Sequence, residues 1–133
     1  MKVEEIMTKR VVTIHMDDRL FTIKNILSAA TFHHLLVVED NILRGIISER
    51  DLLRVLSPYL GTEAESNRDI ETAQRRAHQI MTHSPITISP NTSIKEALRI
   101  MLSHDIGCLP VLDLEEIVGV FTIHDGVRAL IQD

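Results

Sequence analysis

The hydrophobic and polar positions of this chain form one pattern that occurs twice. In the first half the predicted elements are a strand at 11–14, a helix capped by Asp17 or Asp18, strands at 35–39 and 43–48, and a helix at 49–56. In the second half they are a strand at 85–89, a helix capped by Thr92 or Ser93, strands at 109–112 and 118–122, and a helix at 123–131. Each half therefore reads β-α-β-β-α, which predicts an α+β fold.

The two halves also align with each other without a gap. Ile6-Met7-Thr8 recurs 74 positions later as Ile80-Met81-Thr82, and residues 3–56 share 12 identities with residues 77–130. A unit of this size is marginal alone because it buries too little of its surface. We therefore expect two repeats that share a core.

The repeat suggests a division of the chain into three segments. We predict one repeat at 1–60, a second at 78–133, and a charged helical linker at 61–77. In this linker Glu71 precedes Arg75 by four residues, which is the favourable orientation of a helical ion pair. We expect the linker to be solvated and assign it no chemistry.

Composition narrows the classes of protein that the chain resembles. Hydrophobic residues make up 44% of the 133 residues and aromatic residues only 3%, so the core must be aliphatic. The formal net charge is −5 and no run of Lys or Arg occurs, which disfavours nucleic acid as a partner. No apolar run approaches the ~18 residues of a membrane span, and the acidic N-terminus MKVEEIMTKR does not resemble a signal peptide.

Residues with catalytic or metal-binding chemistry do not form a known constellation. Cys108 is the single cysteine, which fits a reducing, cytoplasmic location, and it has His104 nearby but no third orienting group. The seven histidines form neither a CxxC nor an HExxH pattern, so no metal site is expected. Loops of the GxGxxG and GxxxxGK[ST] types are also lacking. We therefore expect a protein that is not an enzyme.

Two related heptads are the main candidates for function: GIISERD at 45–51 and GVFTIHD at 119–125. One interpretation is a helix cap, in which a hydroxyl accepts a backbone N–H and an acid follows in the first turn. The other is a ligand site, in which the hydroxyl contacts a phosphate and the carboxylate accepts both hydroxyls of a ribose. Ile46 and Val120 would then lie against an adenine. Two occurrences at one register favour the ligand site.

These features together resemble a tandem pair of CBS domains, known as a Bateman module. The resemblance is carried by the two Ile-Met-Thr triplets, by the first strands VVTI and PITI, by HHLLVVED and GCLPVLD, and by the two heptads. The length and GCLPV are similar to small stand-alone bacterial members, including the acetoin-utilisation type. The resemblance implies two repeats packed about a pseudo-twofold axis, with two clefts between them that each bind AMP, ADP, ATP or S-adenosylmethionine.

The resemblance also implies a set of residues for each cleft. The first set is Ile46, Ser48, Arg50, Asp51, His33 and His34, closed by Thr92, Ala97, Ile106 and Gly107. The second set is Val120, Thr122, His124 and Asp125, closed by Asp18, Ile23, Phe32 and His33. Arg50 and the paired histidines favour a phosphorylated ligand in the first cleft. In the second, Asp18 would oppose a phosphate, so we expect weak binding, a less charged nucleoside, or no ligand.

The resemblance further implies a homodimer and an output to an unknown effector protein. The candidate interface residues are apolar positions of the closing helices, whose other possible role is internal core: Leu52, Leu53, Leu56, Val127 and Leu130. The alternative function is a ligand-free structural or protein-interaction module whose clefts are vestigial.

Overall fold

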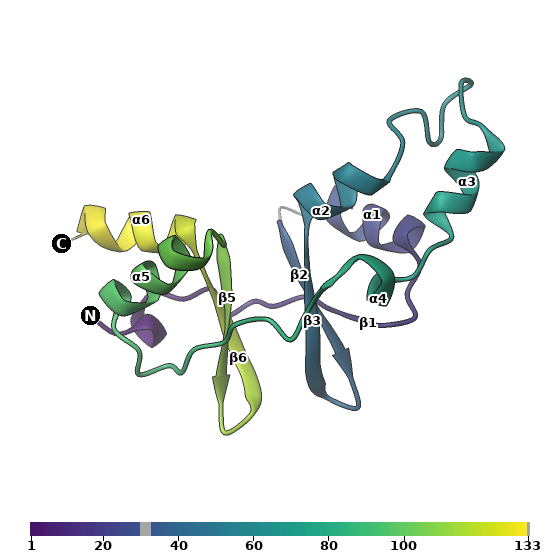
Figure 1. The fold of residues 1–133 in the computed structure, drawn as a ribbon. Coiled ribbons are helices and arrows are strands. Elements are labelled where there is room, and N and C mark those ends of the chain that lie inside the picture. Colours follow the sequence, from purple (N-terminus) through teal and green to yellow (C-terminus); the bar gives the residue numbers. More distant parts are fainter. Residues whose placement is uncertain (30–32, 133) are drawn as a thin grey trace. The chain divides into compact units, whose positions relative to one another are not determined.

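The computed structural model describes residues 1–29 and 33–132. The chain forms two compact units (Figure 1). One comprises Val12–Ser84 and is called the central unit below. The other comprises Met1–Val11 together with Pro85–Asp133 and is called the terminal unit. Both contain helices and strands, and the α+β class with two repeats of one plan is confirmed, although the first strand of the second repeat is reduced to a single bridge at Ile88.

The central unit is built around a four-stranded sheet. Its elements are β1 (Thr13–His15), α1 (Leu20–Ala29), β2 (His34–Glu39), β3 (Ile42–Ser48), α2 (Glu49–Val55), α3 (Asn67–Ala73), α4 (Ala77–Ile80) and β4 (Thr82–His83). The strand order is β1-β2-β3-β4; β1 is parallel to β2, and the other pairs are antiparallel. Because α1 repeats apolar residues at helical spacing, it buries Leu20, Ile23 and Leu27 in the aliphatic core.

The terminal unit repeats this plan, but single bridges take the place of the outer strands of its sheet. Its elements are the 3-10 helix η1 (Val3–Glu5), α5 (Ile94–His104), β5 (Cys108–Asp113), β6 (Glu116–Thr122) and α6 (Ile123–Gln132). The β5–β6 hairpin is flanked by single bridges, a parallel one between Ile88 and Val111 and an antiparallel one between Thr8 and Val120. The predicted strand at 85–89 is therefore wrong. Pro85 and Pro90 bracket this segment without backbone N–H groups, which limits its ladder to Ile88.

The hairpin turns occupy equivalent positions in the two units. Asp40 and Asn41, between β2 and β3, both adopt positive φ, and Leu114 and Glu115, between β5 and β6, do the same. A left-handed conformation suits Asp and Asn but is rare for leucine. The second turn therefore carries no typical sequence signal, and its conformation follows from the strands that it joins.

The compact units do not follow the division at 1–60, 61–77 and 78–133, because the opening segments of the two repeats are exchanged. Val3 and Ile6 are buried in the core of the terminal unit, whereas Ala77 and Met81 are buried in that of the central unit. Full burial of a side chain such as Val3 contributes about 1.5–3 kcal/mol. Each opening segment is thus held by the core of the unit that contains the other heptad.

Two local predictions in the central unit need correction. The linker helix α3 ends at Ala73, which is buried, so Arg75 lies beyond the helix that was expected to pair it with Glu71. Neither Asp17 nor Asp18 caps α1: Ile23 donates its N–H to the Arg19 carbonyl, while the Asp18 carboxylate turns back to the His15 N–H. Across the described residues, no helix is long and apolar enough to cross a membrane.

Candidate functional site

The first heptad joins the end of β3 to the start of α2. Ser48 is extended and its Oγ accepts the N–H of Asp51 at 3.0 Å, while Asp51 Oδ2 accepts the N–H of Ser48 at 2.9 Å. This reciprocal pair is a capping box, which satisfies two N–H groups that the helix leaves without partners. The cap interpretation of GIISERD is therefore confirmed. It uses part of the Asp51 carboxylate and does not exclude a second role.

The remaining acceptor capacity of Asp51 is what makes this heptad a candidate site. Asp51 is half-buried, and among the described residues of the central unit its carboxylate accepts only the Ser48 N–H. A carboxylate offers about four lone-pair sites. Both oxygens of Asp51 can therefore accept a hydrogen bond from two neighbouring hydroxyl groups, such as those of a ribose.

The paired histidines lie beside this carboxylate. His34 opens β2 and pairs in register with Ser48 across the sheet. Burial lowers the pKa of His34, the neighbouring His33 lowers it further, and the Asp51 carboxylate opposes the shift. The neutral form of His34 is therefore favoured. His33 is exposed and its Nδ1 lies 2.9 Å from Oε2 of Glu49.

The second heptad forms the same cap at the junction of β6 and α6. Thr122 Oγ1 accepts the N–H of Asp125 at 3.2 Å, and Asp125 Oδ2 accepts the N–H of Thr122 at 3.0 Å. Here, however, Asp125 is only 1% exposed. Its carboxylate also accepts the Thr8 hydroxyl, at 3.1 Å and 3.2 Å, and Arg128 Nη2 at 2.9 Å.

Thr8 and Arg128 were not predicted as partners of this heptad. A signal was present, since Thr8 matches Thr82 and Arg128 matches Arg54 in the aligned repeats. Sequence alone could not show that Thr8 packs against the heptad of the other repeat. The exchange of the opening segments brings them together.

The heptad glycines have a packing reason. A Cβ on Gly45 would meet the Met81 side chain and, at 2.9 Å, the Thr82 carbonyl. A Cβ on Gly119 would lie 2.8 Å from the Thr8 carbonyl and 2.9 Å from Met7 Sδ. Each glycine therefore allows an Ile-Met-Thr segment to cross its strand closely, which is a structural requirement independent of any ligand.

The other expected site residues lie within their own units as follows. In the central unit, Ile46 is half-buried and pairs with Thr82, Arg50 is exposed, and Ile23 is fully buried in the core. Asp18 is held by the His15 N–H as described above, and Phe32 lies outside the described residues.

The terminal unit holds the remainder. Ala97 is fully buried in the core, Thr92 and Ile106 are half-buried, and Gly107 and His124 are exposed. Val120 is half-buried and exchanges two backbone hydrogen bonds with Thr8, each 2.9 Å long. Ile23 and Ala97 occupy the same repeat position and both pack inside their units.

Cys108 does not have the properties of a nucleophile. Burial raises the pKa of its thiol to about 12, and the nearby Asp125 carboxylate adds to the shift. The thiolate, which is the reactive form, is therefore scarce at neutral pH. Within residues 1–29 and 33–132, no three His, Cys, Asp or Glu side chains gather as a metal-binding group.

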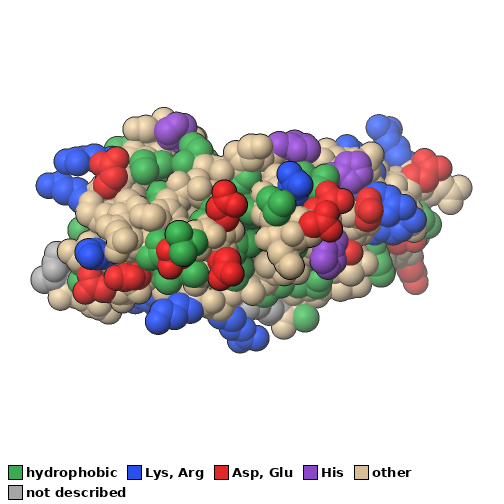
Figure 2. Space-filling model, turned by 90° about the horizontal axis from the view of Figure 1, so that it is seen from below, with side chains coloured by type: hydrophobic (Ala, Val, Ile, Leu, Met, Phe, Trp, Pro, Cys, Tyr) green, Lys and Arg blue, Asp and Glu red, His purple; other side chains and the backbone are tan. Residues whose placement is uncertain are grey.

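Charged side chains are mixed over the surface that Figure 2 shows. Acidic and basic groups are interspersed on this face instead of forming one basic patch. Proteins that bind duplex nucleic acid present a basic surface to the phosphates. This face does not have that character.

Comparison with known proteins identifies the family. The model of the CBS domain matches residues 3–58 and 77–132, so the chain belongs to the CBS domain family and contains two such domains. A CBS domain-containing protein of Dictyostelium discoideum is 36% identical over 136 residues, covering 98% of this chain and 91% of the relative.

Solved structures agree with this assignment. A Vibrio cholerae protein assigned to acetoin utilization, AcuB, is 28% identical with a TM-score of 0.77, over 99% of this chain and 91% of that chain. CBSX2, crystallised in complex with AMP, is 26% identical with a TM-score of 0.80, over 98% of this chain and 96% of that chain. The chain is thus similar to CBS domain pairs along nearly its whole length.

Proposed function

We propose that this chain is a regulatory module that senses an adenosine-containing ligand and catalyses no reaction. The observation that carries the proposal is Asp51: a half-buried carboxylate, fixed by the Ser48 N–H at one oxygen, with acceptor capacity left within its unit. The ligand would be AMP, ADP, ATP or S-adenosylmethionine. The AMP complex of the similar protein CBSX2 supports this class of ligand.

Each residue of the first heptad has a distinct role in this proposal. Asp51 accepts the two ribose hydroxyls, and Ile46 supplies an apolar contact for the adenine. The Ser48 hydroxyl and the exposed Arg50 guanidinium contact the phosphate. His34, which pairs with Ser48 across the sheet, gains a proton when an anion binds beside it.

We place the phosphorylated ligand at the first heptad and not at the second. Arg50 supplies positive charge there and His34 can take up a proton beside a bound anion, whereas Gly107 and Cys108 take the place of the two histidines in the second repeat. Asp125 is buried and already accepts several hydrogen bonds, which also favours the first heptad as the ligand site. A second ligand would therefore bind weakly, if at all.

The output of the module would pass through association with other chains. The exposed side of α6 carries Ile123, Val127, Leu130 and Ile131, spaced as one helical stripe. We propose this stripe as a homodimer surface. Leu52 and Leu56 were also candidates, but both are buried in the core of the central unit, while Leu53 is exposed. A ligand changes such an assembly only by binding one arrangement better than another.

Titration of AMP by calorimetry tests the site. Asp51→Asn should abolish binding, because the amide keeps one acceptor oxygen and replaces the other with an NH2 group, which cannot accept a ribose hydroxyl. The matched control is Asp69→Asn, since Ser66 and Asp69 form the same capping box on α3, away from the heptad. Asp69→Asn should bind AMP like the wild type. Equal loss in both variants would mean that the cap, and not a ligand contact, explains the effect.

Thermal unfolding separates the proposal from the alternative of a ligand-free interaction module. A ligand present at about 100 times its Kd stabilises the folded state by about 2.7 kcal/mol. AMP, ADP, ATP or S-adenosylmethionine should therefore raise Tm by several degrees. If none of the four raises it, the ligand-free module becomes the better description.

A further inference from the structure

The two heptad aspartates are equivalent in sequence but differ in their partners. From this difference we propose that Asp125 anchors the N-terminal segment, Met1–Val11, to α6 and is closed to ligand. The chain would then hold one adenosine ligand, at Asp51. The anchoring role stands on its own contacts, whereas the statement about ligand rests on the proposed function.

The contacts of Asp125 leave no room for ribose hydroxyls. Oδ1 accepts Thr8 Oγ1 at 3.1 Å and Arg128 Nη2 at 2.9 Å. Oδ2 accepts Thr8 Oγ1 at 3.2 Å and the Thr122 N–H at 3.0 Å. The single Thr8 hydroxyl is shared between the two oxygens, so three donor groups enclose the carboxylate and leave it only 1% exposed. A ligand hydroxyl would first have to displace Thr8 or Arg128.

The same contacts tie the N-terminal segment to α6 at two successive points. Arg128 Nη2 donates to the Ile6 carbonyl at 3.2 Å as well as to Asp125, so one guanidinium spans the segment and the helix. Thr8 is held by its hydroxyl and by the pair of backbone hydrogen bonds with Val120. Because a charged acceptor roughly doubles the strength of a hydrogen bond, Asp125 is the strongest of these attachments.

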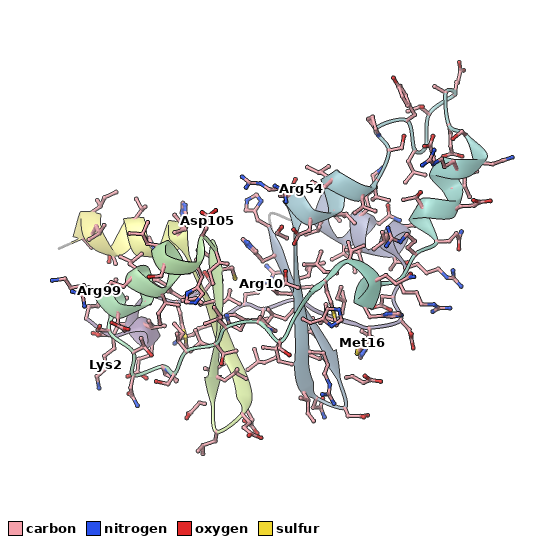
Figure 3. The ribbon with its side chains drawn as sticks, viewed as in Figure 1. Lys2, Arg10, Met16, Arg54, Arg99 and Asp105 are labelled. Atoms are coloured by element: carbon pink, nitrogen blue, oxygen red, sulfur yellow. The ribbon has the colours of Figure 1, made fainter. Side chains whose placement is uncertain are left out.

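The central unit shows that the residue types alone do not create such an anchor. Thr82 and Arg54 occupy the positions of Thr8 and Arg128, yet Thr82 is exposed and Arg54 projects from α2 as an exposed side chain (Figure 3). Among the described residues of that unit, neither side chain donates to Asp51. The anchor is therefore a property of the second heptad, and Asp51 is left as the acceptor for ligand.

Amide hydrogen exchange tests the anchor without any ligand. Thr8→Val removes the hydroxyl at nearly constant shape, and Thr82→Val is the matched control in β4. In Thr8→Val, protection of the Met7 and Thr8-position amides should fall about tenfold or more, as expected for loss of a hydrogen bond to a buried carboxylate. Protection of Ile47 in the central unit should stay unchanged. A loss of protection of less than about threefold at Met7 would overturn the anchor, and so would an equal loss at Met7 in Thr82→Val.

Stoichiometry with AMP tests the closed second heptad. The wild type should bind one AMP per chain, and Asp51→Asn should leave no residual site. Two AMP molecules per chain, one of them lost in Asp125→Asn, would overturn the inference. If the wild type binds no AMP, the proposed function fails, and the exchange data on Thr8→Val still decide the anchor.

Discussion

Gly119→Ala should destabilise the terminal unit, because the added methyl group has no space. It would lie 2.8 Å from the Thr8 carbonyl and 2.9 Å from Met7 Sδ. The methionine side chain can shift, but the Thr8 carbonyl is fixed by its bond from the Val120 N–H. Relief of the clash must therefore move the crossing segment and weaken the Thr8–Val120 pair.

The magnitude follows from overpacking, which costs about 1–3 kcal/mol when the neighbours cannot give way. A loss of about 2 kcal/mol corresponds to a Tm lower by roughly 5–15 °C for a domain of this size. The assay is thermal unfolding followed by circular dichroism, with exchange protection at Thr8 as a local readout. Gly107→Ala is the control in the same unit, since its Cβ would meet nothing closer than Ile123 Cγ1 at 3.9 Å.

The comparison of the two alanine variants decides the question. Gly107→Ala should match the wild type or exceed it slightly, because alanine restricts the unfolded chain. If Gly119→Ala unfolds within about 1 °C of Gly107→Ala, then the close approach of Thr8 is not what the glycine provides. The packing explanation of the heptad glycine would then be refuted.

Three further measurements follow from the same geometry. The Cys108 thiol, whose pKa is raised to about 12, should resist iodoacetamide at neutral pH in the native protein and react in denaturant; rapid native labelling would contradict its burial. The lowered pKa of His34 means that this histidine takes up a proton more readily in the unfolded chain than in the folded one. Tm should therefore fall from about pH 7.5 to about pH 5.5, and His34→Gln should reduce this dependence of Tm on pH. An unchanged pH dependence in the variant would mean that other groups cause it. Ser48→Ala and Ser93→Ala each remove an N-cap, and each should cost about 1 kcal/mol in urea unfolding; no loss would mean that water replaces the cap.

Local structure was largely predictable from the sequence because it depends on neighbouring residues. The period of apolar positions predicted the helices and most strands, and the Ser93 cap of α5 agrees with the prediction. The capping box at Ser48 and Asp51 was readable in the same way, since its atoms lie within three residues. The aligned repeats also indicated the CBS family, because the triplets and heptads that carry the resemblance are short stretches of sequence.

Long-range contacts were not predictable in this way, because the aligned repeats treat the two halves as equivalent. Nothing in the Ile-Met-Thr triplets says that each packs against the heptad of the other repeat. The predicted strand at 85–89 failed for a related reason: its β-branched residues favour extension, but whether a ladder forms depends on the partner and on flanking prolines.

By itself, therefore, the sequence determined the two repeats, their local elements and the two heptads with their caps. Only the tertiary structure decided how the heptads differ. Both carry serine or threonine and aspartate at the same spacing, yet Asp125 is buried by Thr8 and Arg128, while Asp51 is half-buried with one donor among the described residues of its unit. The physical reason is that hydrogen bonding and burial depend on what the folded chain brings beside a carboxylate, and residues 117 positions apart meet only in the fold.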